Sequence, residues 1–156
     1  MKPHILTMGL DAGKTGSYVS GLLFGVGWWI FIDGAAYAAH HNSQIPFNFI
    51  KYLPGILTTL AFVMLNSLDW GMLSADSMTY HGGSDVACRA RTFVLFCVLM
   101  AVGAFVGSIL VLTHSYVGNA FGESTWPGVA ILLQNFLLFL STIIMRIGLI
   151  ASGPAY

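Results

Sequence analysis

The sequence predicts an all-α integral membrane protein, a four-helix bundle of two antiparallel hairpins with both chain ends on the same side of the membrane. Composition is the first reason, because hydrophobic residues make up 56% of the 156 residues and charged residues only 8%. Soluble domains carry roughly 25% charged residues, and so short a chain cannot bury that much apolar surface in water. The other two reasons are four long apolar stretches and an uneven distribution of Lys and Arg.

Each apolar stretch approaches the roughly 20 residues that a helix needs to cross the bilayer. We expect membrane spans at about residues 18–39, 52–68, 92–113 and 127–150. They form a single membrane domain, residues 17–151, between an N-terminal tail of residues 1–16 and a C-terminal tail of residues 152–156. The first stretch is too long for the apolar part of a signal peptide and contains an acid, so we interpret it as a retained helix.

The distribution of positive charge predicts the orientation. Lys51 lies on one side of the four-span arrangement, and the other Lys and Arg residues lie on the opposite side: Lys2, Lys14, Arg89, Arg91 and Arg146. Because positively charged segments stay in the cytosol, we expect both chain ends to face the cytosol or its organellar equivalent. The longest connection, from Asp69 to Arg91, is polar and Gly-rich and is expected to be a loop on this side.

Composition and motifs argue against several function classes. The net charge is zero and no basic patch contains interleaved aromatic residues, so nucleic-acid binding has no electrostatic support. The stretch GLDAGKTG lacks the spacing of a phosphate-binding loop. His40 and His41 are adjacent and cannot share a helix face as metal ligands, and Cys88 and Cys97 are interpreted as reduced thiols. We therefore expect no enzyme, no metal and no cofactor other than structural lipids.

Polar residues inside the apolar stretches are the candidate site. Asp33 lies about six residues from the far end of its span, roughly 9 Å at 1.5 Å per residue. Gln134 and Asn135 lie about 11 Å from the same boundary by the same rise. Because a buried carboxylate can accept hydrogen bonds from amide groups, these residues predict an intramembrane polar clasp between the first and fourth spans.

A second polar layer is expected near the side of the chain ends. Asn66 and Asp69 come late in the second span, and Arg146 comes late in the fourth, which runs in the same direction. Arg146 can pair with Asp69 or extend its charged end to the lipid headgroups.

Two hypotheses follow for Asp33. As part of a clasp it would hold helices together, which contributes about 0.5–2 kcal/mol in membranes. As an ion- or proton-binding site it would serve a small transporter or channel. A transport path usually needs a continuous polar stripe or a helix broken in mid-membrane, and the sequence contains neither. The clasp is therefore favoured, with transport as the alternative.

Small residues spaced by four predict close helix packing. Gly21 and Gly25 form one such pair, and Gly103 and Gly107, followed by Ser108, form another. Glycines at this spacing let two helix backbones approach closely. They mark the first and third spans as contact helices, either within the bundle or with a partner.

Several stretches together resemble a known family. They are GVGWWIFIDGA in the first span, PGILTTLAFVMLNS in the second, Ala90-Arg91, Gly107-Ser108, and PGVAILLQNFLLF in the fourth. In this order, over roughly residues 17–148, they resemble the transmembrane protein 50 family and its fungal vacuolar protein sorting 68 branch. Gly34 departs from this pattern, since the resemblance leads us to expect alanine there.

The resemblance implies a four-span protein without known catalysis, whose fungal branch is linked to endosome-to-vacuole sorting together with another small four-span protein. It implies a scaffold or accessory subunit of a larger membrane assembly, in contact with lipids and other integral membrane proteins. Endosome, Golgi or vacuole is the expected location, and a large complex of a mitochondrial or other organelle membrane stays an alternative. The polar residues that match are Asp33, Asn66, Arg91, Gln134 and Asn135.

Overall fold

Four long helices make up most of the chain. The computed structural model describes residues 3–68 and 83–152, which form α1 (Pro3–His40), α2 (Leu53–Ser67), α4 (Gly83–Val111) and α5 (Trp126–Ser152). A short 3-10 helix, η1 (Phe49–Lys51), precedes α2, and a π-helical turn, η2 (Leu112–Tyr116), follows α4. Four helical stretches are long and apolar enough to cross a membrane: Ala12–His40, Phe49–Ser67, which joins η1 to α2, Cys88–Tyr116, which joins α4 to η2, and Trp126–Ala151. The predicted fold class, an all-α four-helix membrane bundle, is confirmed.

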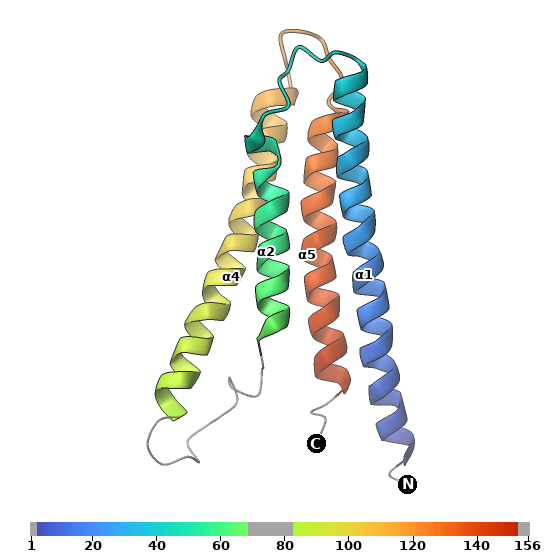
Figure 1. The fold of residues 1–156 in the computed structure, drawn as a ribbon, viewed down its shortest axis with the longest axis vertical. Helices are drawn as coiled ribbons and strands as arrows, with labels where there is room; N and C mark the ends of the chain where they lie inside the picture. Colours follow the sequence, from blue (N-terminus) through green and yellow to red (C-terminus); the bar gives the residue numbers. More distant parts are fainter. Residues whose placement is uncertain (1–2, 69–82, 153–156) are drawn as a thin grey trace.

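Two helices are longer than their predicted spans. Helix α1 begins at Pro3, within the segment that the sequence predicted as a tail. Helix α4 begins at Gly83, so the later part of the predicted Asp69–Arg91 loop is helical. Ala and Arg residues in that part have high helix propensity, which the search for apolar spans did not weigh. Helix α1 begins and α5 ends at the same end of the bundle, and which membrane face this end occupies stays a prediction (Figure 1).

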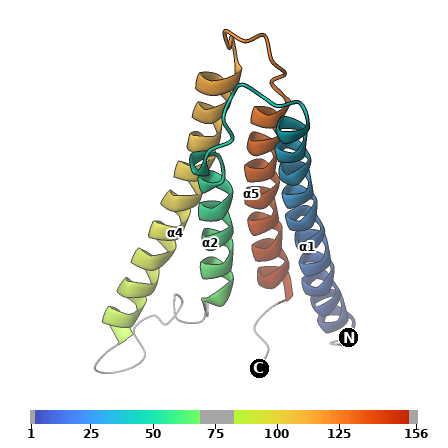
Figure 2. The ribbon, with the colours of Figure 1, turned by 45° about the horizontal axis from the view of Figure 1, so that its top comes forward.

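Helix α5 lies at the centre of the bundle. It contacts α1 on one side and α2 on the other, and it also contacts α4. Figures 1 and 2 both show the order α4, α2, α5, α1, with α4 diverging from α2 toward the end where α4 begins. The chain is therefore organised by the packing of the outer helices on α5.

Small residues form the seam between α1 and α5. A Cβ added to Gly16 would lie 2.9 Å from the Cα of Gly148, so the two backbones are in direct contact there. One turn further, the hydroxyls of Ser20 and Ser141 lie 2.9 Å apart, and the Ser141 hydroxyl also donates to the Ser20 carbonyl at 2.8 Å. In a bilayer, close packing and hydrogen bonds of this kind drive helix association.

The seam continues through two glycines of α1 toward the loop end, which is the end of the bundle where α1 ends and α5 begins. A Cβ on Gly27 would lie 2.7 Å from Leu138 and 3.3 Å from the carbonyl oxygen of Gln134. A Cβ on Gly34 would lie 2.5 Å from the Cβ of Ala130. Ser20, Gly27 and Gly34 follow one another at intervals of two helical turns, which keeps them on one face of α1.

The predicted glycine pairs do not form this seam. Around the Cβ positions of Gly21, Gly25 and Gly103 the described part of the chain places no atom within 4 Å. Gly107 comes near one atom, the Cγ of Pro54 at 4.0 Å. The physical reason is rotation: each residue turns a helix by about 100°, so Gly21 points away from the face that its neighbour Ser20 presents to α5.

Ser108, the remaining predicted packing residue, lies on the buried face of α4. Its side chain is fully buried and its hydroxyl donates to the carbonyl of Phe105 in the same helix at 2.6 Å. Cys97, Ala101 and Ala104 are buried on the same face. Small side chains therefore let α4 pack on its neighbours, although the exposed Gly103 is not among them.

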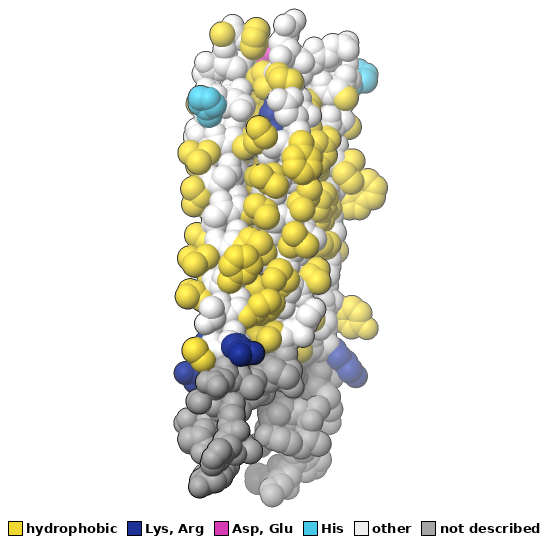
Figure 3. All heavy atoms as spheres, turned by 60° about the vertical axis from the view of Figure 1, so that its left-hand side comes forward, with side chains coloured by type: hydrophobic (Ala, Val, Ile, Leu, Met, Phe, Trp, Pro, Cys, Tyr) yellow, Lys and Arg dark blue, Asp and Glu magenta, His cyan; other side chains and the backbone are white. Residues whose placement is uncertain are grey.

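The surface of the bundle has the pattern of a lipid-embedded protein. Large hydrophobic side chains such as Leu22, Trp29 and Leu99 are more than half exposed. Figure 3 shows hydrophobic side chains over the middle of one face, with Lys and Arg at the end where the helices α1 and α4 begin and His near the opposite end. Such a band bounded by polar groups is what a bilayer requires.

Candidate functional site

A buried polar contact joins α2 and α5. Asn135 of α5 is fully buried, and its Oδ1 accepts a hydrogen bond from the Thr58 hydroxyl of α2 at 2.6 Å. The Asn135 amide nitrogen donates to the Ile131 carbonyl of its own helix at 2.9 Å. Both polar atoms of this side chain are thereby satisfied, as burial in an apolar medium requires.

Gln134 lies at the point where α1, α2 and α5 meet. Its side chain is fully buried, and a Cβ added to Gly55 of α2 would lie 2.6 Å from both of its amide atoms. On the other side of α5, its backbone carbonyl faces Gly27 of α1. Neither amide atom of Gln134 has a hydrogen-bond partner among the described residues. Because Gly55 of α2 and Gly27 of α1 have no side chains, they leave room for Gln134 of α5 between the helices.

Asp33 is separated from the two amides. Its side chain is on the exposed surface of α1, and its Oδ2 accepts a hydrogen bond from the indole nitrogen of Trp126 at 2.8 Å. Trp126 is the first residue of α5, so this bond fixes the start of α5 against α1. Within the described residues no hydrogen bond joins Asp33 to Gln134 or Asn135. Equal depth did not bring them together, because Asp33 is rotated by about 100° from the seam residue Gly34.

The second polar layer is partly described. Asn66 is half-buried on α2, and its side-chain amide has no hydrogen-bond partner within the described ranges. Arg146 is half-buried on α5. Asp69 lies outside the described residues, so its pairing with Arg146 stays a prediction.

A buried lysine at the loop end was not predicted as a site residue. Lys51 is only 5% exposed, and its ammonium donates to the carbonyl of Pro46 at 2.5 Å. The ammonium also lies 4.6 Å from the ring centre of Tyr116 and 5.4 Å from that of Phe47. Aromatic faces attract cations at such distances, so the connection before α2 is held against the end of α4.

Glu123 ties the two loops of this end together. Its carboxylate accepts hydrogen bonds from the Ser43 hydroxyl and, at 2.5 Å, from the backbone nitrogen of Gln44. The bond from Ser43, followed by the bond from Gln44, holds the pKa of Glu123 below its usual range. Its own backbone nitrogen donates to Asn119 at 2.9 Å, which orders the connection between α4 and α5.

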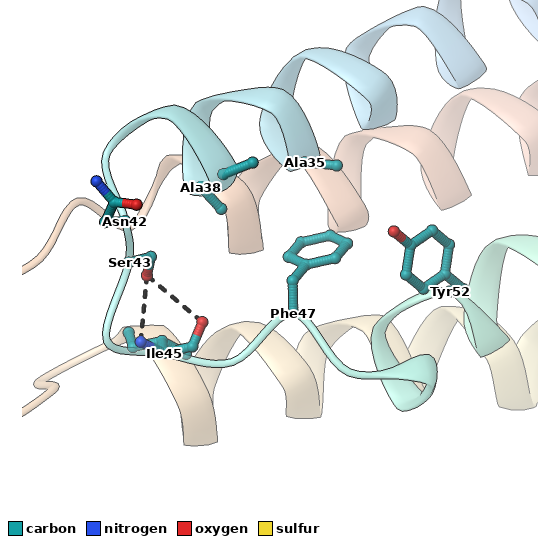
Figure 4. Close-up of a pocket in the computed structure, with 8 residues that line it drawn as sticks. Ala35, Ala38, Asn42, Ser43, Ile45, Phe47 and Tyr52 are labelled. Atoms are coloured by element: carbon teal, nitrogen blue, oxygen red, sulfur yellow. Dashed lines mark hydrogen bonds between the residues drawn. The ribbon is translucent and has the colours of Figure 1, made fainter.

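A pocket of about 280 Å³ lies beside these loops, between the end of α1 and the connection to η1 (Figure 4). Ala35 and Ala38 of α1 form one wall, and Phe47 and Tyr52 lie opposite them, with ring centres 5.3 Å apart. Its other lining residues are Ala39, Asn42, Ser43 and Ile45. Among the described residues no group of three or more His, Cys, Asp or Glu side chains could hold a metal ion.

Comparisons with known proteins agree on one family. A model of an uncharacterised protein family, UPF0220, matches residues 2–151. The transmembrane protein 50 homolog of Dictyostelium discoideum is 31% identical over 134 residues, covering 81% of this chain and 84% of that protein. The vacuolar protein sorting-associated protein 68 of Saccharomyces cerevisiae is 32% identical over 149 residues, covering 86% of this chain and 80% of that protein.

A UPF0220 protein of Schizosaccharomyces pombe is 31% identical over 140 residues, covering 88% of this chain and 82% of that protein. No solved structure matches the chain. The family match and the relatives confirm the resemblance drawn from the motifs of the four spans. The chain therefore belongs to the UPF0220 family, alongside the transmembrane protein 50 homolog and vacuolar protein sorting-associated protein 68.

Proposed function

We propose that this protein is a non-enzymatic subunit that stabilises a larger membrane assembly in protein sorting, in an endosomal or vacuolar membrane. The name of its yeast relative supports the link to vacuolar protein sorting, and its four apolar helices support an integral membrane location. One structural observation carries the subunit role: Gly21, Gly25 and Gly103 meet no neighbouring atom within 4 Å in the described part of the chain.

These outward glycines are unfavourable unless something packs on them. Glycine in a helix interior is about 1 kcal/mol less favourable than alanine, and a glycine facing lipid gains no packing in return. Inside the chain, by contrast, Gly16 and Gly34 each allow a neighbouring backbone or side chain to approach α1. A partner helix that approaches α4 at the exposed Gly103 would use this residue in the same way.

The subunit role is tested by the size of the native assembly. We expect the tagged chain, extracted in a mild detergent, to migrate with other integral membrane proteins in a large complex. Gly103→Leu should release the chain from this complex, because a leucine blocks close approach. Val98→Leu is the matched control, since it adds bulk to exposed α4 surface about 140° away around the helix.

Two results would contradict the proposal. The first is a wild-type chain that migrates alone in its detergent micelle. The second is a complex that tolerates Gly103→Leu as well as Val98→Leu. Unfolding of each purified variant separates a defect in assembly from a defect in folding.

A transport role for Asp33 receives less support. Its carboxylate lies on the exposed side of α1 and is engaged by Trp126, rather than lying between the helices with Gln134. We therefore expect Asp33→Asn to leave both the assembly and ion flux in proteoliposomes unchanged. Loss of flux with the assembly intact would favour the transporter instead.

A further inference from the structure

Lys51 is held in an unusual way for a lysine at the edge of a membrane span. Lysines near helix ends normally extend their ammonium groups outward to the headgroups and water. Here the side chain turns inward and only 5% of the residue is exposed, although its neighbours Phe49 and Ile50 are 69% and 64% exposed. The positive charge is thus set back behind an apolar surface.

The ammonium has few partners in this position. Within the described part of the chain it makes one hydrogen bond, to the Pro46 carbonyl, and contacts two aromatic rings. Among the described residues no carboxylate forms a salt bridge with it. The carboxylate of Glu123 attracts it from a longer distance and accepts its hydrogen bonds from Ser43 and Gln44. A buried cation without a direct salt bridge is costly, so an external anion within hydrogen-bond distance would be favoured here.

A cavity of about 150 Å³ has Lys51 in its lining. Its lining residues are Ile45, Pro46, Asn48, Ile50, Lys51, Val111 and Ser115. The Asn48 amide and the Ser115 hydroxyl can donate hydrogen bonds beside the lysine, while the remaining walls are apolar. A small cluster of donors around one buried positive charge is the arrangement that binds a phosphate oxygen.

We propose that this cavity binds the phosphate group of an anionic phospholipid, with Lys51 as its charged ligand and Asn48 and Ser115 as further donors. Phosphate chemistry alone would also fit a soluble phosphate. The surroundings favour the lipid, because the exposed Ile50 lines the cavity and Phe49, its exposed neighbour in the sequence, extends this apolar surface, on which the glycerol and acyl chains of a bound lipid would pack. The inference is independent of the proposed subunit role.

Native mass spectrometry of the full chain tests the site. Protein released from mixed micelles with equal amounts of phosphatidylglycerol and phosphatidylcholine should retain phosphatidylglycerol with about tenfold preference. Both lipids carry a phosphate, but the choline cation of phosphatidylcholine opposes its attraction to Lys51, whereas phosphatidylglycerol carries a net negative charge. Lys51→Met should abolish this preference. Lys14→Met is the control, since Lys14 is an exposed lysine of α1 at the opposite end of the bundle.

A second variant keeps the test valid if Lys51→Met does not fold. Asn48→Asp changes an exposed side chain at the mouth of the cavity and puts a negative charge there, so it should also abolish the preference. The proposal would be overturned by equal retention of the two lipids by the wild type, by an unchanged preference in folded Lys51→Met, by equal loss in Lys14→Met, or by an unchanged preference in Asn48→Asp. Displacement of the lipid by an equal concentration of glycerol phosphate would assign the site to a soluble anion and overturn the lipid.

Discussion

The contact between Thr58 and Asn135 offers the most direct test of how polar residues hold this bundle together. The Thr58 hydroxyl lies 2.6 Å from Asn135 Oδ1 and 3.0 Å from the Pro54 carbonyl of its own helix. Thr58→Val removes this hydroxyl and keeps the branched shape of the side chain. Both partners are at most 1% exposed, so the Asn135 oxygen would be left without a donor in an apolar environment.

The magnitude follows from two terms. Hydrogen bonds between membrane helices contribute about 0.6 kcal/mol on average and up to about 1.7, and an unsatisfied buried acceptor costs about 1–3 kcal/mol. We therefore expect Thr58→Val to lower the free energy of unfolding by about 1–2 kcal/mol. Thr59→Val is the matched control, because the Thr59 hydroxyl donates only within α2, to Gly55 at 2.7 Å, and we expect a change within about 0.5 kcal/mol.

The assay is reversible unfolding of the purified protein in bicelles by a denaturing detergent, followed by tryptophan fluorescence. A double-mutant cycle with Asn135→Leu isolates the pair, and we expect a coupling energy of about 0.6–1.7 kcal/mol. Equal destabilisation by Thr58→Val and Thr59→Val would refute the assignment of this contact as a stabilising interhelical hydrogen bond. So would a double mutant whose loss of unfolding free energy equals the sum of the two single losses.

Two further expectations concern the seam and the loops. Gly34→Ala should destabilise the protein by about 1–3 kcal/mol, because its Cβ would lie 2.5 Å from that of Ala130. Gly21→Ala, where no neighbouring atom of the described chain lies within 4 Å, should be neutral or stabilising when both variants are unfolded by the same denaturing detergent. Acidification should weaken the contact that Glu123 makes between the two loops, because the folded state lowers the pKa of this carboxyl. The stabilisation is present above the usual carboxyl pKa of about 4.3. It is lost as the pH falls through the lower pKa of the folded state. The unfolding temperatures of wild type and Glu123→Gln should therefore converge at low pH, and a constant difference would contradict this.

The fold class followed from the sequence because it depends on composition, which local detail cannot reverse. A chain with 8% charged residues has few alternatives to a bilayer. The ends of the helices were harder to predict, because hydropathy marks where the lipid begins rather than where the helix begins. Helix α1 therefore starts at Pro3, although its predicted span starts at about residue 18.

The sequence predicted how deep in the membrane the candidate site residues lie, but not which face of its helix each residue occupies. Counting residues placed Asp33, Gln134 and Asn135 at one level of the membrane, but the face of each helix that meets its neighbour depends on tertiary packing. A different periodicity in the sequence carried this information: Ser20, Gly27 and Gly34 recur at intervals of seven. Such spacing keeps small residues on one helix face. Of the glycines in pairs spaced by four, Gly21, Gly25 and Gly103 meet no neighbouring atom within 4 Å in the described part of the chain.

The loop end was not predicted because its contacts join segments distant in the sequence. Lys51 appeared only as the one basic residue on its side of the membrane, and Glu123 carried no signal at all. Their roles depend on a folded arrangement in which Glu123 meets Ser43 and Lys51 meets Tyr116. No periodicity or spacing within a single span contains that information.

The arrangement of the helices also limits where a partner can dock. In the most apolar stretch of α5, 39% of the residues are buried, against 22% in the corresponding stretches of α1 and α4. Helix α5 already uses its faces for α1, α2 and α4, so a partner helix would find the outer helices more available. These are also the helices whose glycines, Gly21 and Gly103, remain open. We therefore expect crosslinks to other membrane proteins from α1 and α4, and a crosslinking pattern centred on α5 would contradict the packing described for this chain.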